Sequence, residues 1–228
     1  MSTPLPQGED KARTVRGLFD TIAPRYDVVN RLMTFGMDVG WRRRAVRELH
    51  LPSGSLVFDL ACGTGDLCRE LERAGYRAVG LDFAFGMLRQ AKTDAPLVQG
   101  DALRLPFRDA SADGVTCGFA LRNVASLPQL FAELARVVRP GGSAALLDAS
   151  RPDNRVLRAG HALYFEKVVP LIGGALSDRA AYGYLPRSMA YLPSTAEMVG
   201  MLRAVGFPSI RRLQLSGGVT QLFVGTRA

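Results

Sequence analysis

The fold is decided by the stretch Leu56-Val57-Phe58-Asp59-Leu60-Ala61-Cys62-Gly63-Thr64-Gly65-Asp66-Leu67. Its apolar first half predicts a buried parallel strand, and the amphipathic residues 66–74 predict a helix that follows a tight turn. The glycines at positions 63 and 65 let this turn adopt positive φ and let a ligand approach the backbone closely. Because open α/β sheets bind ligands at the carboxyl ends of their strands, we expect a binding site here.

The turn departs from both standard phosphate-binding motifs. A dinucleotide fingerprint has a third glycine where this chain has Cys68, and a phosphate loop ends in Gly-Lys-Ser/Thr, which is absent. Asp59 precedes the turn instead. A carboxylate at that position suits a cationic or amine-bearing ligand better than a pyrophosphate.

Two further carboxylates follow neighbouring predicted strands. Val79-Gly80-Leu81-Asp82 ends one strand, and Gln99-Gly100-Asp101-Ala102 closes the next. Asp82 stands where an acidic residue binds ribose hydroxyls in doubly wound folds. Three carboxylates at successive strand ends, together with the Gly-x-Gly turn, resemble the S-adenosylmethionine site of class I methyltransferases.

This resemblance implies a role for each part of the motif. Asp59 and the turn would face the amino acid part of S-adenosylmethionine, Asp82 the ribose, and Asp101 with Ala102 the adenine. The alternative is that Asp59 caps its turn and the other two are ordinary loop carboxylates. The predicted cofactor-binding residues are Asp59, Ala61, Gly63, Thr64, Gly65, Asp82, Phe83, Met87, Asp101, Ala102 and Phe119.

Composition indicates a soluble enzyme. The chain has 228 residues, a net charge of +8 and 47% hydrophobic residues, which predicts one domain spanning 1–228. No apolar run reaches the roughly 20 residues that span a bilayer. Residues 1–11 are predicted to form a flexible tail rather than a secretion signal, so we expect a cytoplasmic protein. Cys62, Cys68 and Cys117 lack metal-binding or disulfide spacing, and no metal site is predicted.

From residue 56 onward strands alternate with helices, which predicts parallel βαβ units. Strands are expected at 56–60, 77–81, 97–99, 114–118, 144–148, 209–214 and 219–226, with a hairpin at 216–218 and a sharp turn at 139–142. Helices are expected at 66–74, 85–93, 127–138 and 195–204. With the class I resemblance, this predicts a Rossmann-like α/β fold: a seven-stranded, mostly parallel sheet with an antiparallel last strand and helices on both faces.

Two helical segments are added to this pattern. Residues 12–51 are expected to form a helical cover, with a helix over 26–36 and another that opens at Trp41. Residues 152–193 interrupt the alternation with helical pieces at 157–169 and 180–188, which predicts a lid over the substrate. The third helix of the cover carries four arginines, which form either a solvated face or a contact with lipid headgroups: Arg42, Arg43, Arg44 and Arg47.

Three blocks resemble one family, the ubiquinone/menaquinone biosynthesis C-methyltransferases of the UbiE type. They are residues 19–36 with Trp41-Arg42, residues 118–124, and residues 182–188 preceded by 170–173. The resemblance implies C-methylation of a reduced polyprenyl quinone, demethylmenaquinol first and a ubiquinone precursor, 2-methoxy-6-polyprenyl-1,4-benzoquinol, second. Another small molecule or nucleic acid is a further alternative. Nucleic acid ranks low because residues 120–123 lack the Asn-Pro-Pro-Tyr-like turn of base-flipping enzymes. The run 147–150 and the pair Ala125-Ser126 depart from the family pattern beside the expected acceptor pocket.

The implied chemistry needs a stabilised phenolate and a route for the ring proton to leave. Arg122, directly after the fourth strand, is the candidate phenolate partner, and Asn123 would position the same region. An arginine can hold an oxyanion but is itself a poor base. The alternative for Arg122 is a structural pair with a carboxylate. Asp148 can act as a base if burial raises its pKa. Tyr26 and Tyr184 are candidates for hydrogen bonds at the acceptor, or else pack as aromatic residues.

The isoprenoid tail needs an apolar channel. Met33, Phe35, Met37 and a helix over 163–172 can supply one, although they can equally be ordinary core. His161, in the apolar helical stretch 159–163, is expected to be a core histidine. A basic enzyme that touches the membrane surface transiently, at the inner face of the cell membrane, would reach a lipid-soluble quinol without spanning the bilayer. The sequence does not indicate an oligomeric state.

Overall fold

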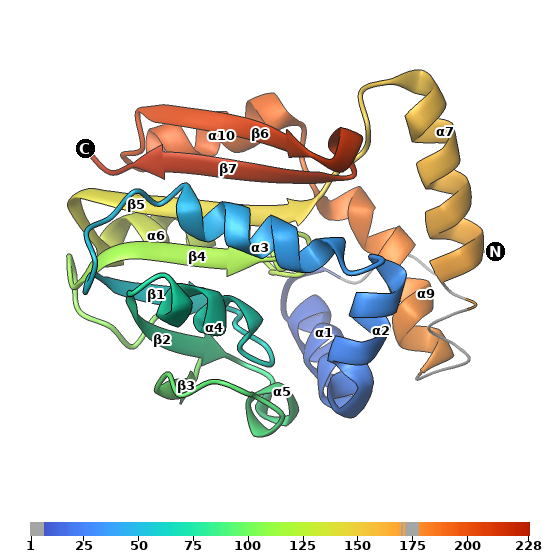
Figure 1. Cartoon of the computed structure of the whole chain (residues 1–228), viewed down its shortest axis with the longest axis horizontal. Coiled ribbons are helices and arrows are strands. Elements are labelled where there is room, and N and C mark those ends of the chain that lie inside the picture. Colours follow the sequence, from blue (N-terminus) through green and yellow to red (C-terminus); the bar gives the residue numbers. More distant parts are fainter. Residues whose placement is uncertain (1–6, 170, 172–177) are drawn as a thin grey trace.

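A seven-stranded sheet forms the centre of the computed structural model, which describes residues 7–169, 171 and 178–228 (Figure 1). The strand order is β3-β2-β1-β4-β5-β7-β6. Every neighbouring pair is parallel except those that β7 makes with β5 and β6, so the prediction of an antiparallel last strand is confirmed. The strands are β1 (Leu56–Leu60), β2 (Arg77–Asp82), β3 (Leu97–Gln99), β4 (Ala112–Gly118), β5 (Val138–Ala149), β6 (Ser209–Leu215) and β7 (Thr220–Thr226).

Helices cover both faces of the sheet. The N-terminal helices are α1 (Gly8–Ile22), the 3-10 turn η1 (Ala23–Arg25), α2 (Tyr26–Met33) and α3 (Met37–Arg47). Those between the strands are α4 (Asp66–Arg73), α5 (Phe85–Arg89) and α6 (Leu127–Val137). After β5 come α7 (Arg155–Leu163), the π-helical turn η2 (Tyr164–Val168), α9 (Arg179–Ser188), η3 (Met189–Tyr191), α10 (Thr195–Ala204) and η4 (Ser216–Gly218).

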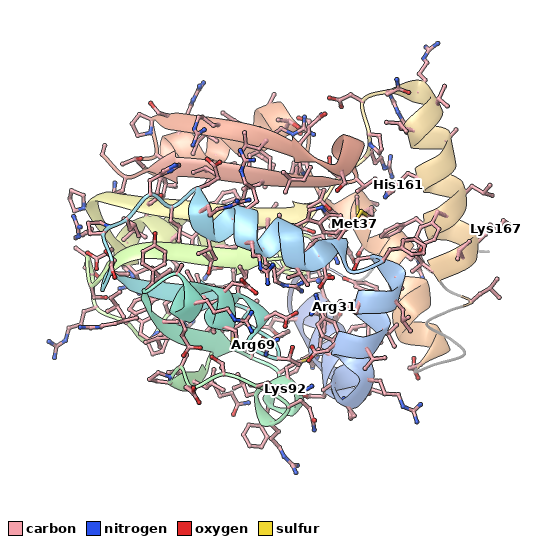
Figure 2. The ribbon with its side chains drawn as sticks, in the orientation of Figure 1. Arg31, Met37, Arg69, Lys92, His161 and Lys167 are labelled. Carbon is pink, nitrogen blue, oxygen red and sulfur yellow. The ribbon has the colours of Figure 1, made fainter. Side chains whose placement is uncertain are left out.

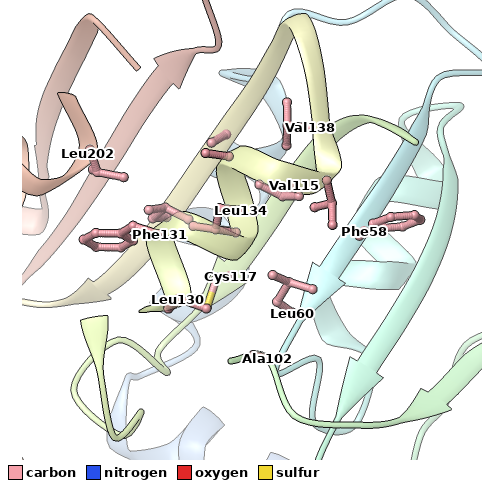
Figure 3. Close-up of a cluster of buried hydrophobic side chains, with 14 of the residues drawn as sticks. Phe58, Leu60, Ala102, Val115, Cys117, Leu130, Phe131, Leu134, Val138 and Leu202 are labelled. Atoms are coloured by element: carbon pink, nitrogen blue, oxygen red, sulfur yellow. The ribbon is translucent and has the colours of Figure 1, made fainter. Parts of the chain in front are cut away.

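Strand alternation divides the core into two layers. Phe58 and Leu60 of β1 point toward α6 and α10, where Phe131 and Leu134 are fully buried (Figure 3). Val57 points to the opposite layer, in which Leu71 of α4 and Ala45 of α3 are buried. Asp59 therefore shares the α3–α4 side of the sheet with Val57, and its burial is a direct consequence of strand register.

The structure corrects several predicted boundaries. β5 begins at Val138, because residues 139–142 loop out as a bulge instead of ending the strand: the pairing with β4 jumps from Ala112↔Val138 to Gly114↔Ser143. A Cβ at position 142 would lie 2.6 Å from the Asp113 carbonyl oxygen, so this close approach requires glycine. α5 ends at Arg89, well before the predicted residue 93.

The N-terminal segment also differs from the prediction. α1 starts at Gly8, and Lys11, which we assigned to the tail, is buried and donates from Nζ to the Val124 carbonyl oxygen at 2.7 Å. α3 starts at Met37 rather than Trp41. α3 packs in the layer with α4, and its first turns, like α1 and α2, contribute to the cavities at the carboxyl ends of the strands. Residues 1–6, 170 and 172–177 of the predicted tail, lid and channel helix lie outside the described part of the chain.

Ion pairs join the N-terminal helices to α4. Arg42 of α3 is 7% exposed and pairs with Asp38 and, at 3.3 Å, with Asp66 in the first turn of α4. Arg31 and Arg69, labelled in Figure 2, also pair with Asp66. Arg43 pairs with Glu70 and Arg44 with Glu48. Most of the predicted arginine cluster is therefore bound to carboxylates of the protein, which argues against a contact with lipid headgroups.

We predict that Arg42→Ala lowers the free energy of unfolding by about 3 kcal/mol, because removal of one partner leaves buried charge without compensation. Arg43→Ala is the matched control: its side chain is 59% exposed, and an exposed pair contributes less than about 1 kcal/mol. Urea denaturation of both variants measures the difference. Equal losses would contradict the structural role assigned to Arg42.

Candidate active site

Two cavities adjoin at the carboxyl ends of β1, β2 and β4. The smaller has a volume of about 90 Å³, and the larger about 450 Å³. Phe19, Tyr26 and Phe119 line both. These three aromatic side chains therefore form a wall that the two cavities share.

The smaller cavity contains most of the residues predicted to bind the cofactor. Asp101 lies at its rim, and its Oδ1 accepts from the backbone N–H of Leu103 at 2.9 Å. Asn123, predicted as a positioning residue near the acceptor, lies on this side instead. The residues of the prediction that line the smaller cavity are Ala61, Gly63, Asp82, Phe83, Met87, Asp101, Ala102 and Phe119.

The turn after β1 has the backbone that the sequence predicts. Gly63 has φ +57° and Gly65 φ +80°, and Gly65 is the N-cap of α4. A Cβ at position 63 would meet no atom within 4 Å, whereas one at position 65 would lie 2.7 Å from a Thr93 methyl group. Gly63 thus leaves free space on the side of the cavity, and Gly65 is required by packing.

Asp82 is fixed by two backbone donors. Gly63 N–H donates to Oδ2 and Ala84 N–H donates to Oδ1, each at 2.8 Å. The side chain is 5% exposed, and burial raises the pKa of Asp82 to about 6 in spite of these donors. A carboxylate held in this way at the end of β2 presents its remaining lone pairs to the cavity, as ribose hydroxyls require.

Asp59, by contrast, does not reach either cavity. Its Oδ1 accepts from Thr116 Oγ1 at 2.7 Å and its Oδ2 from the Cys68 thiol at 3.5 Å. The side chain is 1% exposed, and burial raises the pKa of Asp59 to about 7. The direct contact between Asp59 and the cofactor stays a prediction; in this structure the Asp59 carboxylate is bound to Thr116 of β4 and Cys68 of α4.

Thr64 and Gly65 also lie outside the walls of the two cavities. The Thr64 hydroxyl donates to Asp27 of α2, which in turn pairs with Lys92 at 3.5 Å. These contacts fasten α2 to the Gly-x-Gly turn. Thr64 therefore couples the N-terminal helices to the site.

The lining of the smaller cavity carries groups of the kinds that the expected cofactor would need. The open side of Gly63 provides room against the backbone, Asp82 provides a fixed acceptor, and Asn123 provides a second one. Asn123 is 6% exposed; its Nδ2 donates to the Phe119 carbonyl oxygen, while its Oδ1 is buried without a partner. A buried acceptor without a partner at a cavity wall is accounted for by a donor on a bound molecule, such as an amino group.

The larger cavity is predominantly apolar and contains two of the predicted catalytic residues besides Tyr26. Figure 2 shows Met37 and His161, from α3 and α7, on its facing sides. Tyr184 is 9% exposed, and its hydroxyl has no hydrogen-bond partner among the described residues. Burial raises the pKa of both Tyr184 and Tyr26. Met33 and Phe35 line this cavity as the tail-channel hypothesis requires.

Arg122 enters the larger cavity as one half of an ion pair. Its Nη1 and its backbone N–H both donate to Asp148, which also accepts from the Ala149 N–H at 2.7 Å. Asp148 is completely buried and lines neither cavity. Asp148 therefore holds Arg122 in place, and its role as a base stays a prediction.

The sequence prediction missed the contribution of α1. Ala12, Val15 and Phe19 line the smaller cavity, and Gly86 N–H donates to Asp20 Oδ1 at 2.7 Å. The signal was present, since residues 15, 18, 19 and 22 recur at helical spacing. This pattern identifies an apolar face and leaves open whether the face packs on a core or on a ligand.

Comparison with known proteins gives the family. Residues 7–227 match the ubiE/COQ5 methyltransferase family. The demethylmenaquinone methyltransferase of Deinococcus radiodurans is 42% identical over 98% of this chain and 97% of its own length. The ubiquinone/menaquinone biosynthesis C-methyltransferase UbiE of Syntrophotalea carbinolica is 40% identical over 93% of this chain and 94% of its own.

Solved structures agree on the fold. An S-adenosylmethionine-dependent methyltransferase from Thermotoga maritima superimposes with a TM-score of 0.68 at 19% identity, over 94% of this chain and all of that one. At this identity the likeness concerns the fold alone. The match over nearly the whole sequence leads to one conclusion: the chain belongs to the ubiE/COQ5 methyltransferase family and is an S-adenosylmethionine-dependent methyltransferase.

Proposed function

We propose that this enzyme methylates a ring carbon of a reduced polyprenyl quinone and that its substrate is demethylmenaquinol. The observation that carries the proposal is the shared wall of the two cavities, because it brings a cofactor site against an apolar chamber of about 450 Å³. The relatives named demethylmenaquinone methyltransferase, from Desulfitobacterium hafniense and Deinococcus radiodurans, support this choice of acceptor.

In the smaller cavity, residues of the chain would bind the cofactor and orient it. Asp82 would hold the ribose hydroxyls, Asn123 Oδ1 would accept from the adenine amino group, and the open side of Gly63 would admit the cofactor against the backbone. When bound, S-adenosylmethionine supplies an electrophilic methyl group. α1 closes over this site through Ala12, Val15 and Phe19 and excludes water from it.

On the acceptor side, Arg122 would stabilise the phenolate form of the quinol. Its charge is permanent, and the Asp148 pair fixes its orientation in an otherwise apolar chamber, where an ionic interaction is strong. The Tyr184 hydroxyl would donate to an acceptor oxygen, which satisfies an otherwise unpaired buried group. Tyr26 would contact both molecules, since it lines both cavities. The quinol ring carbon would gain the methyl group as the bond between the methyl carbon and sulfur breaks, S-adenosylhomocysteine would leave, and the ring proton would pass to solvent, which restores the aromatic ring.

The direct test is a turnover assay with S-adenosylmethionine and short-chain demethylmenaquinol, kept reduced, in detergent. A parallel reaction contains the 2-methoxy-6-polyprenyl-1,4-benzoquinol precursor of ubiquinone. Methylation of demethylmenaquinol alone supports the proposal. Methylation of the benzoquinol alone would show that the acceptor is the ubiquinone precursor. Tight cofactor binding without either product would contradict the proposed function.

Gly63→Ala is predicted to weaken S-adenosylmethionine binding by at least about tenfold, because the new methyl group points into the free space at the cofactor wall. Gly54→Ala is the matched control: position 54 also has positive φ, +83°, and free space around it, but lies in a distant turn. Both changes carry a similar backbone strain of about 1 kcal/mol. Isothermal titration calorimetry compares them, and an equal loss in both would refute the role of Gly63.

Cofactor affinity is predicted to fall as the pH drops through about 6, where Asp82 becomes protonated. With a pKa of about 6, the ionised fraction at pH 5 is about one tenth, so the affinity falls about tenfold. Asp82→Asn removes this dependence, whereas Asp59→Asn leaves a drop below pH 6. The pKa values of both carboxyls are raised in the folded state, so their protonation stabilises the fold as the pH falls toward 4, and unfolding through these groups does not explain the loss.

Tyr184→Phe is predicted to lower kcat/KM for the quinol by about tenfold while the affinity for S-adenosylmethionine stays unchanged, because Tyr184 lines the larger cavity and not the smaller one. Tyr76→Phe is the control, since the Tyr76 hydroxyl donates to the Leu51 carbonyl oxygen away from both cavities. Steady-state kinetics with both variants measures the effect. Unchanged kinetics in Tyr184→Phe would leave its hydroxyl without a role in the reaction.

A further inference from the structure

Exposed large hydrophobic side chains are concentrated at one end of the molecule. Of the ten found in the described part of the chain, nine lie in residues 28–37 or 156–171, and the tenth is Phe85. Val156 is 80% exposed, Phe35 75% and Leu163 63%. We call these two segments the apolar end; its exposed members are Val28, Leu32, Phe35, Met37, Val156, Leu157, Leu163, Val168 and Leu171.

The two segments form one surface. The Phe35 and Tyr164 rings are 5.8 Å apart, and the Tyr164 hydroxyl donates to the Met33 carbonyl oxygen at 2.8 Å. In Figure 1, α7 stands beside α2 at the side of the molecule away from the C-terminus. α7 has no buried residue at all, although it is amphipathic. A contiguous apolar surface of this kind marks a site of interaction.

Positive charge surrounds the α7 part of this surface. Arg151, Arg155, Arg158 and Lys167 are all exposed, and Figure 2 shows Lys167 on the outer side of η2. Residues 151–168 contain two acidic residues, Asp153 and Glu166, and Asp153 already pairs with Arg212 at 3.7 Å. Exposed apolar side chains next to arginine and lysine are the composition of helices that lie in a membrane interface.

The surface is continuous with the larger cavity. Phe35 and Met37 from one segment, and Val156 and Leu157 from the other, are exposed outside and line the cavity as well. Leu32, Leu163 and Val168 are exposed but do not line it. These four apolar side chains therefore connect the apolar end with the wall of the larger cavity.

We propose that the apolar end is the surface by which this enzyme docks on a bilayer containing anionic phospholipids. Val28, Leu32, Leu163 and Val168 enter the acyl boundary, while the arginines of α7 and Lys167 bind lipid phosphates. No described helix is long and apolar enough to cross the membrane, so the contact is peripheral. That the cargo entering the cavity is a polyprenyl quinol rests on the proposed function; docking itself does not.

The test is flotation of the full chain with vesicles, without cofactor or quinol. Vesicles of phosphatidylcholine with one quarter phosphatidylglycerol are compared with phosphatidylcholine alone. The double variant Leu32→Asp/Leu163→Asp is expected to bind anionic vesicles on the order of tenfold more weakly than the wild type. Phe85→Asp is the matched control, because Phe85 is 53% exposed and lies outside the apolar end. Equal binding of the wild type and the double variant, or the same loss in Phe85→Asp, would overturn the proposal.

Two further measurements separate the alternatives. Arg155→Glu/Lys167→Glu is expected to abolish the preference for anionic vesicles. An unchanged preference would show that these two cations do not bind lipid phosphates. Sedimentation velocity without vesicles tests a second copy as the occupant. Self-association of the wild type that the double variant abolishes, with no vesicle binding, would replace the bilayer by a dimer interface.

The proposed function can fail independently. The double variant should keep wild-type turnover of a short-chain quinol in detergent and lose at least about fivefold with a long-chain quinol in vesicles. Vesicle binding without methylation of any quinol would refute the function and leave the docking surface. Methylation of the long-chain quinol in vesicles at the same rate by both proteins would refute the docking surface and leave the function.

Discussion

The site depends on the buried ion pairs that Arg42 makes with Asp38 and Asp66. Asp66 opens α4 directly after the Gly-x-Gly turn, and Asp38 belongs to the first turn of α3. Arg42 therefore ties the position of the cofactor turn to the N-terminal helices that close it. Since the same guanidinium lines the larger cavity, a shift of α3 would alter the acceptor chamber and the cofactor turn together.

A second buried ion pair, Arg122 with Asp148, fixes the position of a charged group at the wall of the larger cavity. An isolated cation in an apolar chamber would be costly, and an isolated carboxylate at the end of β5 equally so. Paired, they cost less and fix a positive group beside the acceptor. The pair also realises the alternative that the sequence left open for Arg122, an arginine at a strand end that is paired with a carboxylate.

The sequence was informative wherever a residue's role follows from its own strand. The β1 turn, Asp82 and Asp101 could be placed because the strand ends of a parallel sheet share one edge. The partners of Asp59 could not be predicted in this way. Which face of the sheet a side chain occupies depends on strand register, and Asp59 lies on the face where Cys68 of α4 donates to it. That α1 lines the smaller cavity could not be predicted for another reason. The apolar face with Val15 and Phe19 has the same helical spacing whether it packs on a core or lines a cavity. The bulge at 139–142 depends on a contact with the Asp113 carbonyl, which local sequence does not encode.

α7 has no buried residue because its inner face lines the larger cavity instead of packing on the core. α6 buries Leu130, Phe131 and Leu134 against the sheet, and its outer face is free to be polar. α7 instead contributes Leu157 and His161 to the wall of a cavity, and none of its residues is buried in a packed core. A wall that is one helix thick and apolar inside gains little stability in water. Such a helix is expected to be among the least stable elements of the fold, and a hydrophobic molecule inside, or an apolar medium outside, supplies the contacts that the protein itself does not provide.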